Sequence, residues 1–525
     1  MASGDGGVLA RFGQFDRASM SYVLPLEPSV VAHALRVAGD PELRRRVYTA
    51  AHSHGVPGKL ELLRSMARAR HELATGLGFG AFAEMATSFR LAGSPAGVMA
   101  FLDGLSHEIR APAQRELEEL RRLKAAAEGD PEIRAWDVPL YQRLALQRRV
   151  GDELERASAY FSVETCLDGL RLVCERLFEL RLDTEADPPE KWAPDVRKVV
   201  LRDASDGAAV GVLYLDLYRR PGKYANAAHF QVRCNHSVYP LTYFERRRRG
   251  TAACGTGTGT GYGTAPCLNP DGADPTEQDG VLPGQLPVGV MVCNLEKGRA
   301  SVISHAQAKT LFHEFGHALQ ALLSRTGLQH FSGTRGELDF VEAPSQLMEY
   351  LCYDARVLPM FARHHTTREP IPAATVAALN EARKAFSALE LQQQIAFAVG
   401  DQLIFGGVAQ DKPFHEMSDA EVERALERLH ARYLSVPHVP GTCWPARFGH
   451  LATYGAAYYS YTYARAFAAD LWHTCFEADP LDARVGRRYR QEVLRFGGSK
   501  DPKLMLREML GRPFSADALV REVCN

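Results

Sequence analysis

Apolar and charged residues recur at three- and four-residue spacing along most of the chain, which is the pattern of amphipathic helices. The pattern covers about residues 27–190 and returns from 302 to the end. Clusters of Pro and Gly interrupt it, and each cluster predicts a boundary between helices. These breaks lie near 95, 129–131, 188–189, 327–336, 370–372, 437–445 and 497–498. We therefore expect a mainly α protein.

A different pattern occupies residues 196–300. The segment Val210–Tyr218 is rich in β-branched and aromatic residues and is followed by a Pro-Gly turn, which predicts a strand. Shorter segments of the same kind at 199–201, 229–234 and 287–294 complete a small sheet. A Gly-, Thr- and Pro-rich stretch at about 235–286 reads as a low-complexity insertion. The chain thus divides into a helical region (1–195), a small sheet with this insertion (196–300) and a second helical region (301–525).

Composition excludes several classes of protein. The 62 Lys and Arg residues balance 63 Asp and Glu residues, whereas a general nucleic-acid-binding protein usually carries a basic excess. The longest apolar-leaning stretch without a charge, 451–464, is shorter than the roughly 20 residues that span a bilayer. The ten cysteines form no Cys-x-x-Cys pair, which indicates free thiols in a reducing compartment. We expect no nucleic-acid partner and no membrane span.

Several polar segments have ordinary explanations. The Gly-Thr tract at 255–263 lacks the spacing of a phosphate-binding loop and predicts a flexible loop instead. Four consecutive arginines at 246–249 are expected to be a solvated run. The histidine pairs at 52/54 and 364/365 have no partner at the spacing of metal ligands.

The segment Leu311–Gln320 contains the candidate metal-binding and catalytic residues. It contains His313-Glu314-x-x-His317, the helical zinc-binding pattern. At 100° per residue, both histidines fall one turn apart on the side opposite an apolar stripe, with Glu314 beside them. The pattern suits two imidazole ligands and a neighbouring general base. Two exposed histidines on an amphipathic helix would give the same five residues, so a third ligand is needed.

Glu342 is the candidate for that third ligand. It lies just before Pro344, which suits the first turn of a new helix, and it shares a helical face with Gln346 and Glu349. Two His and one Glu leave the fourth zinc position open, as a catalytic site requires. An acid near a helix N-terminus is also favoured by the helix dipole alone, so position does not decide between the two explanations.

Three segments, at 310–319, 331–335 and 339–346, resemble the thimet-oligopeptidase family of zinc peptidases, and the chain is most similar to the plant and algal type of its mitochondrial intermediate-peptidase branch. The resemblance covers about residues 60 to 520. It extends to segments with no part in the zinc motif, which are Trp136-Asp137, Tyr214–Tyr218, Gly222-Lys223, His229-Phe230, Leu286–Val288, Tyr433, Phe448–Leu451, Tyr454–Tyr461 and Gly497-Gly498.

Residue roles follow from the resemblance. It implies His313, His317 and Glu342 as ligands of one Zn²⁺ per chain, and Glu314 as the general base. It further implies that Tyr461 donates a hydrogen bond to the developing oxyanion, with Tyr454 and His450 in a neighbouring substrate-binding loop. A stripe of helix-packing aromatics is the alternative for these tyrosines, and Tyr458 and Tyr459 fit that alternative.

The resemblance also implies a fold and a function. The fold is a two-lobed helical metallopeptidase with a deep substrate channel and a small β-sheet lining the cleft. Independently of the resemblance, we expect the strand at 287–294 to hold an extended peptide by β-augmentation. The substrate is a short peptide or the N-terminal segment of an imported precursor protein, such as an octapeptide. The expected enzyme is a monomer of the mitochondrial matrix, with cytoplasm or chloroplast as the alternative. Most of the family's longer N-terminal helical region is expected to lie outside this sequence.

Two other functions stay open. The chain could be a general oligopeptidase of the same family that degrades free peptides, which a comparison of precursor-derived and unrelated peptides would distinguish. It could instead be a non-catalytic peptide-binding remnant, although the complete His-Glu-His-Glu set favours an active zinc metalloendopeptidase.

Overall fold

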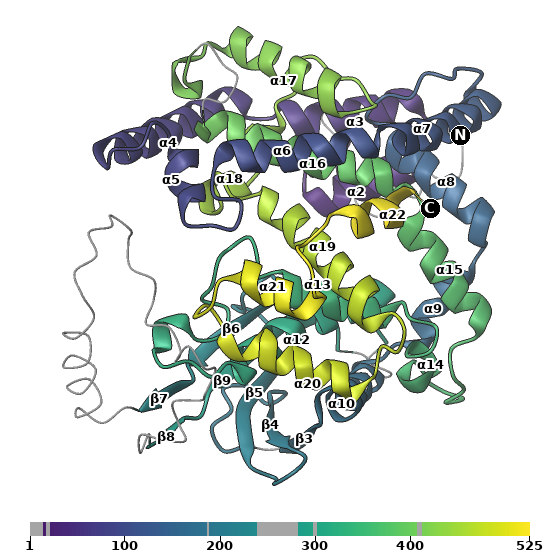
Figure 1. Cartoon of the computed structure of the whole chain (residues 1–525). Coiled ribbons are helices and arrows are strands. Elements are labelled where there is room, and N and C mark those ends of the chain that lie inside the picture. The colour runs from purple at the N-terminus through teal and green to yellow at the C-terminus, as the bar shows by residue number, and fades with distance from the viewer. Residues whose placement is uncertain are drawn as a thin grey trace. The chain divides into compact units, whose positions relative to one another are not determined.

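The computed structural model describes residues 14–16, 21–185, 188–238, 282–297, 302–406 and 412–524. The chain divides into two compact units, each built from separate segments (Figure 1). Unit 1 consists of 1–155, 377–466 and 516–525, and unit 2 consists of 156–376 and 467–515. The three consecutive regions expected from the sequence follow composition along the chain, whereas these units follow packing in space.

In its described residues, unit 1 is helical apart from the short pair β1 (Gln14–Asp16) and β2 (Ser21–Val23). Side-chain caps and glycines set its helix boundaries: Ser94 accepts from the backbone N–H of Gly97 at the start of α6, and left-handed Gly129 ends α7. Its helices are α2 (Pro28–Val37), α3 (Pro41–Ser53), α4 (Val56–Gly76), α5 (Phe82–Ser88), α6 (Pro95–Glu108), α7 (Arg110–Glu128), α8 (Val138–Val150), α16 (Ser387–Gly406), α17 (Asp419–Tyr433), α18 (His450–Thr453) and α22 (Asp517–Cys524). Three further helices, α9 (Glu153–Ala157), α15 (Ala373–Lys384) and α19 (Tyr459–Leu471), continue from one unit into the other.

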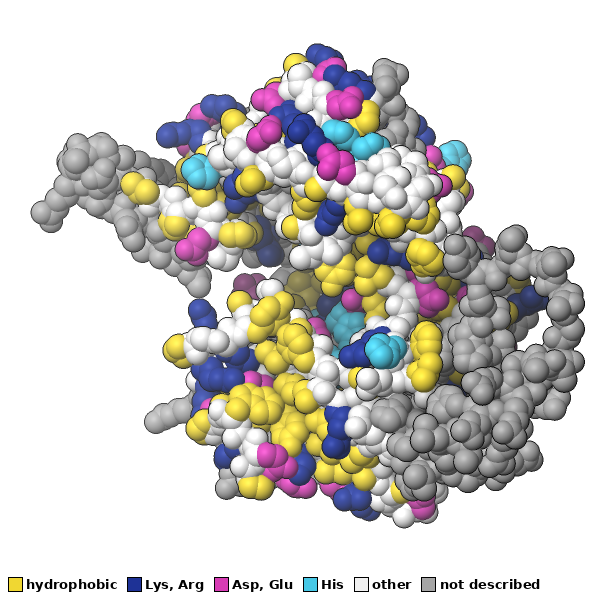
Figure 2. Space-filling model, turned by 90° about the vertical axis from the view of Figure 1, so that its left-hand side faces the viewer, with side chains coloured by type: hydrophobic (Ala, Val, Ile, Leu, Met, Phe, Trp, Pro, Cys, Tyr) yellow, Lys and Arg dark blue, Asp and Glu magenta, His cyan; other side chains and the backbone are white. Residues whose placement is uncertain are grey.

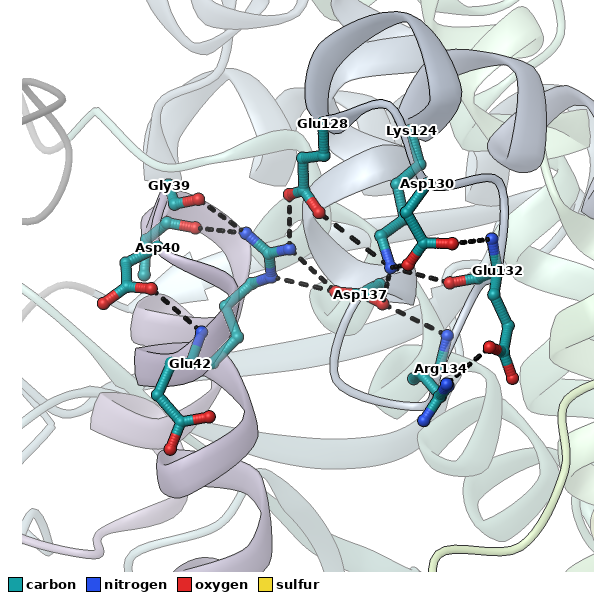
Figure 3. Close-up of polar contacts among 11 residues, drawn as sticks. Gly39, Asp40, Glu42, Lys124, Glu128, Asp130, Glu132, Arg134 and Asp137 are labelled. Carbon is teal, nitrogen blue, oxygen red and sulfur yellow. Dashed lines mark hydrogen bonds and ion pairs between the residues drawn. The ribbon is translucent and has the colours of Figure 1, made fainter.

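A buried ion-pair network fixes α3, α7 and the start of α8 inside unit 1 (Figure 3). The Arg44 guanidinium is fully buried and donates to Asp137 Oδ1 at 2.8 Å and to Glu128 Oε1 at 2.7 Å. Lys124 Nζ donates to the other oxygen of Asp137 at 2.9 Å. Each buried charge therefore has an opposite partner, which offsets the desolvation of the whole group.

Unit 2 contains a five-stranded sheet in the order β3-β4-β5-β9-β6. Only the β5–β9 pair is parallel among its four pairings; the others are antiparallel. The strands are β3 (Leu180–Glu185), β4 (Arg197–Asp203), β5 (Ala209–Tyr218), β6 (Ala228–Arg233) and β9 (Val288–Leu295), and a separate pair joins β7 (His236–Val238) to β8 (Leu282–Gln285).

Helix α12 (His305–Leu323) packs against β5, β6 and β9. Gly211 on β5 permits this packing, because a Cβ there would lie 2.9 Å from Cδ2 of Leu322. The remaining helices of unit 2 are α10 (Val163–Phe178), α13 (Ala343–Glu349), α14 (Leu358–Phe361), α20 (Ala483–Glu492) and α21 (Pro502–Leu510), with a π-helical turn at Trp472–Phe476.

The predicted mainly α fold with a small sheet is confirmed, and four strands lie where the sequence predicted them. Two details were wrong. Strand β3 lies within the stretch expected to be helical, because the segment Leu180–Glu185 is short and pairs with β4 rather than continuing α10. The segment 287–294 has no free edge for a peptide, since β9 pairs with β5 on one side and β6 on the other. The outer strands are β3 and β6, and β6 is the one that pairs with β9.

The cysteines that the structure describes agree with the expectation of free thiols. All eight cysteines in the described residues are free, while Cys254 and Cys267 lie outside them. The Gly-Thr tract and the arginines at 246–249 also lie outside the described residues.

No described helix has both the length and the hydropathy to span a bilayer. The face shown in Figure 2 has acidic, basic and hydrophobic side chains interspersed.

Removal of the central carboxylate of the network should destabilise unit 1. Asp137→Ala leaves the buried Arg44 without its main partner, and breaking a buried pair from one side typically costs about 3–5 kcal/mol. We expect a clear fall in the midpoint of denaturant-induced unfolding. Glu42→Gln is the control, because Glu42 pairs with Arg45 at an exposed position and its loss should leave the midpoint unchanged. Equal midpoints for both variants would contradict a stabilising role for the network.

Candidate metal centre and aromatic cluster

Helix α12 presents the zinc-binding pattern as the sequence predicted. Ser304 and Gln307 form a capping box that starts the helix at His305. The apolar stripe of Leu311, Phe315 and Leu319 is buried, with each residue at most 2% exposed. His313 and His317 lie one turn apart with ring centroids separated by 5.1 Å.

Glu342 completes a three-residue cluster with these histidines. Its Oε2 lies 3.3 Å from Nε2 of His313 and 3.2 Å from Nε2 of His317. Within the described ranges, this trio is the one group of at least three His, Cys, Asp or Glu side chains whose ligand atoms all lie within 4.8 Å. The structure therefore brings together the three residues that the sequence singled out as metal ligands.

A close helix contact places Glu342. A Cβ on Gly316 would lie 2.5 Å from Cα of Ser345 and 2.8 Å from the carbonyl oxygen of Pro344, so only glycine allows α13 to approach this closely. Pro344 lies in the first turn of α13, as predicted, and Glu342 is the residue just before the helix. Ser345 Oγ donates to Oε2 of Glu342 at 3.0 Å and so restrains the carboxylate.

A second carboxylate orients His313. Glu349 Oε1 lies 2.8 Å from Nδ1 of His313, and its other oxygen lies 3.2 Å from Nζ of Lys309. Metal-ligating histidines commonly donate their second ring N–H to such a carboxylate. Glu349 was expected on the face of Glu342 but without a role, and no role was expected for Lys309. The i, i+7 spacing of the two glutamates was the available signal.

The electrostatics of this cluster favour a bound cation. With Nδ1 donating to Glu349, the Nε2 of neutral His313 presents a lone pair toward Oε2 of Glu342, so a positive charge is needed between them. Burial alone would lower the pKa of His313, but hydrogen bonds with Glu342 and Glu349 raise it to about 10. Burial would raise the pKa of Glu342, yet the two histidines hold it well below its usual range. A proton or a metal ion can supply this charge, and the two nitrogens and one oxygen match the donor set of zinc.

Glu314 lies next to the trio in a buried setting. Its residue is 7% exposed, and burial raises the pKa of its carboxyl, with His317 and His313 opposing the shift in part. Strand β6 contributes His229, whose pKa falls to about 3 because it is buried and close to His317. Burial is the largest cause of both pKa shifts.

The predicted aromatic residues also lie together, in unit 1. Ring centroids of His450 and Tyr461 are 5.8 Å apart, and those of Tyr454 and Tyr461 are 6.2 Å apart. Tyr454 is 38% exposed, whereas Tyr458 and Tyr459 are buried, which fits the packing role expected for the latter two. Burial lowers the pKa of His450. The structure thus forms the cluster but does not by itself give Tyr461 a catalytic role.

Comparison with known proteins identifies a peptidase family. The model of peptidase family M3 matches residues 34–524. Similar curated proteins include the mitochondrial intermediate peptidases of Arabidopsis thaliana (35% identical, covering 93% of this chain) and Homo sapiens (32% identical, covering 94%). The matched regions make up 63% of each relative, so the chain spans less than two thirds of their length.

Solved structures agree on the fold. A crystal structure assigned to an oligoendopeptidase F superposes with a TM-score of 0.51 at 14% identity, covering 98% of this chain and 72% of that one. A structure assigned to a peptidase from Chlamydophila abortus gives the same TM-score at 13% identity, covering 98% and 68%.

The contact at Gly316 can be tested through metal binding. Gly316→Ala places a methyl group against backbone atoms of α13, so the helix must move and carry Glu342 away from the histidines. We expect metal affinity to fall at least tenfold, the lower end of what disturbed ligand support typically costs. Competition with a chromogenic chelator measures the affinity. Gly104→Ala is the control, because no atom lies within 4 Å of its added Cβ; unchanged affinity in Gly316→Ala would contradict the contact's role.

Proposed function

The chain belongs to peptidase family M3, and on this basis we propose that it is a zinc-dependent endopeptidase acting on short peptides or on N-terminal segments of imported precursor proteins. The observation that carries the proposal is the convergence of Nε2 of His313, Nε2 of His317 and Oε2 of Glu342, with Glu314 beside them. We further propose that it processes mitochondrial precursors by octapeptide removal in the matrix. The relatives' names, mitochondrial intermediate peptidases, support a mitochondrial peptidase.

Three side chains would hold the zinc ion. His313, His317 and Glu342 offer the two nitrogens and one oxygen of a catalytic site, and Glu349 would keep His313 in the required tautomer. A zinc ion bound there supplies Lewis acidity and lowers the pKa of water toward neutrality. The three ligand side chains and Glu349 would only hold the ion and each other in place, because none of them needs to gain or lose a proton during the reaction.

Glu314 would move the proton. Its carboxylate lies on α12 beside the two histidines, where it can accept a proton from the attacking water and return it to the leaving amine. Its raised pKa, caused mainly by burial, makes it a better base than an exposed glutamate. A general base of this kind typically contributes 10²–10⁴-fold to the rate.

The aromatic cluster would contact the substrate. A phenol is uncharged near neutral pH and can donate a hydrogen bond, so Tyr461 is suited to the oxyanion that develops on the scissile carbonyl. His450 and Tyr454, which lie within ring-contact distance of Tyr461, would contact the bound peptide. Removing one oxyanion donor typically costs about 2.7–4 kcal/mol of transition-state stabilisation.

Strand β6 would hold the peptide backbone. It is one of the two outer strands of the five-stranded sheet and the one next to α12, and its neighbour β9 is already paired on both sides. An extended peptide can add to such an edge through main-chain hydrogen bonds, which bind many sequences with little dependence on side chains. Placement of β6 beside α12 suits cleavage of the added peptide near Glu314.

The substrate class can be decided by competition. A quenched peptide copied from the N-terminal segment of an imported precursor should be cleaved, and a chelator of zinc should abolish the cleavage. Processing specificity predicts a kcat/KM clearly above that for unrelated peptides of equal length. Equal kcat/KM values would instead favour a general oligopeptidase of the same family.

Two substitutions should separate metal binding from proton transfer. Glu342→Gln should lose zinc, because a neutral amide oxygen is a poorer ligand than a carboxylate. Glu314→Gln should retain zinc and lose at least 10²-fold in turnover, because it removes the base but no ligand. Metal analysis and steady-state kinetics on one quenched peptide test both. Full zinc and activity in Glu342→Gln, or loss of zinc in Glu314→Gln, would refute these roles.

Tyr461→Phe tests the oxyanion role, because it keeps the ring and deletes the hydroxyl. An oxyanion donor predicts a fall in kcat of roughly 10²–10³ with little change in KM, since the hydrogen bond strengthens mainly in the transition state. A packing tyrosine predicts near-normal kinetics and at most a modest change in melting temperature. Tyr459→Phe, at a fully buried position of the same helix, is the matched control.

A further inference from the structure

The loop between α18 and α19 carries two of the proposed substrate contacts. His450 begins α18, and Tyr454 directly follows its last residue, Thr453. The loop then runs to Tyr458, before α19 starts at Tyr459. Side chains from α4 and α16, helices distant in sequence but in the same unit, hold the backbone of this segment.

Arg70 of α4 holds the first half of the segment. Its two terminal nitrogens donate to the carbonyl oxygens of Leu451 at 2.6 Å and Ala452 at 2.8 Å, which are carbonyls that so short a helix leaves open. The guanidinium lies over the rings of Phe82 and Phe405, at 5.0 and 4.6 Å from their centroids. These contacts fix the plane of the guanidinium and therefore the direction of both hydrogen bonds.

Gly455 provides the room for this contact. A Cβ at residue 455 would lie 2.2 Å from Nη1 of Arg70 and 2.8 Å from its Cζ. Any side chain there would displace the guanidinium from the two carbonyls. The glycine at residue 455 therefore leaves the space that the Arg70 guanidinium occupies.

Asp401 of α16 holds the second half. Its side chain is fully buried, and its two oxygens accept from the backbone N–H groups of Ala456 at 2.8 Å and Tyr458 at 2.9 Å. Gln402 donates from Nε2 to the carbonyl oxygen of Ala456 at 3.1 Å. Burial raises the pKa of Asp401 to about 7, with backbone N–H groups and Arg70 opposing the shift.

Ala456 shows that these contacts impose a conformation. Its φ of 57° lies in the left-handed region, which an alanine rarely adopts without support from its surroundings. Both its N–H and its carbonyl oxygen are bound by α16, by Asp401 and Gln402 respectively. The backbone turn that connects Tyr454 to Tyr458 is therefore maintained by side chains outside the loop.

We propose that Arg70 and Asp401 are positioning residues that hold the loop 450–458 in the conformation that presents His450 and Tyr454 to a peptide substrate. The proposal deepens the peptidase function and rests on it. A loop that is already ordered does not lose conformational freedom when the substrate binds, so its ordering strengthens binding without any contact from Arg70 or Asp401 to the peptide. Loss of either residue should therefore raise KM more than it lowers kcat.

Conservative substitutions test this proposal. Asp401→Asn keeps the shape but replaces one of two accepting oxygens with an NH₂ group, and Arg70→Lys keeps the charge but cannot donate to both carbonyls in the same geometry. We expect each to raise KM roughly tenfold, the change that losing one hydrogen bond to a charged group implies. We expect kcat to stay within about threefold, zinc content to be unchanged, and amide exchange in residues 450–458 of the intact protein to accelerate.

The chain offers a matched control for each substitution. Glu116 also accepts two backbone N–H groups of α16, at Ala388 and Leu389, but far from the loop in sequence. Arg64 lies on α4 like Arg70 and pairs with Asp419 instead of the loop. Glu116→Gln and Arg64→Lys should leave KM and loop exchange unchanged. Gly455→Ala should reproduce the Arg70→Lys effect, and the double variant should be no worse than either single one.

Two readouts distinguish the possible failures. Amide exchange reports on the loop whether or not the parent protein cleaves peptides, so an inactive parent with faster exchange in Asp401→Asn refutes the peptidase function but not the holding contacts. Unchanged exchange and unchanged KM in both Asp401→Asn and Arg70→Lys would overturn the proposal. An equal rise of KM in the Glu116 and Arg64 controls would also overturn it, because the effect would then be general.

Discussion

Gly316 sets how near helix α12 can come to the first turn of α13. Its missing side chain brings the backbone of Ser345 into contact with α12, and Glu342 reaches both histidines only at that separation. The His-His-Glu cluster is therefore a consequence of backbone packing as much as of the identity of its three residues. Other features of the site depend on the same contact, because Glu349 lies on α13 and orients His313 across the same interface.

Features that arise within one element were predictable from the sequence. The helical period placed His313 and His317 on one side of α12 and its apolar stripe on the other, and the structure buries that stripe. Pro344 correctly predicted the start of the helix that follows Glu342. Strands β4, β5, β6 and β9 followed from composition, but their order did not, so the sequence assigned the peptide-binding edge to a strand that is paired on both sides.

Features that depend on distant segments were not predictable. Arg70 and Leu451 are 381 positions apart, and Asp401 and Ala456 are 55 apart, so no local spacing connects them. The same holds for Arg44 and Asp137, which are 93 positions apart yet form a fully buried pair. In each case the sequence shows an ordinary charged residue on a helix, and only the packing of several helices turns it into a buried group with a fixed partner.

Two carboxylates are buried in the part of unit 1 that the structure describes, Asp137 and Asp401, and they have different kinds of partner. Asp137 faces two cations, Arg44 and Lys124, which is a stable arrangement for a permanent scaffold. Asp401 faces backbone N–H groups, and burial raises its pKa to about 7. A buried carboxyl bound by backbone N–H groups, next to an alanine held in the left-handed region, is hard to explain by stability alone.

A positive φ at a non-glycine residue can have a local reason. Glu179, for example, ends α10, where a left-handed residue closes the helix. Ala456 ends no helix, and its conformation is imposed by the side chains of Asp401 and Gln402. Proteins tend to break local rules where function requires a particular geometry. The buried carboxyl of Asp401 and the left-handed Ala456 both support the loop that carries His450 and Tyr454. Their coincidence is a separate argument that this loop contributes to function, together with the His-His-Glu cluster.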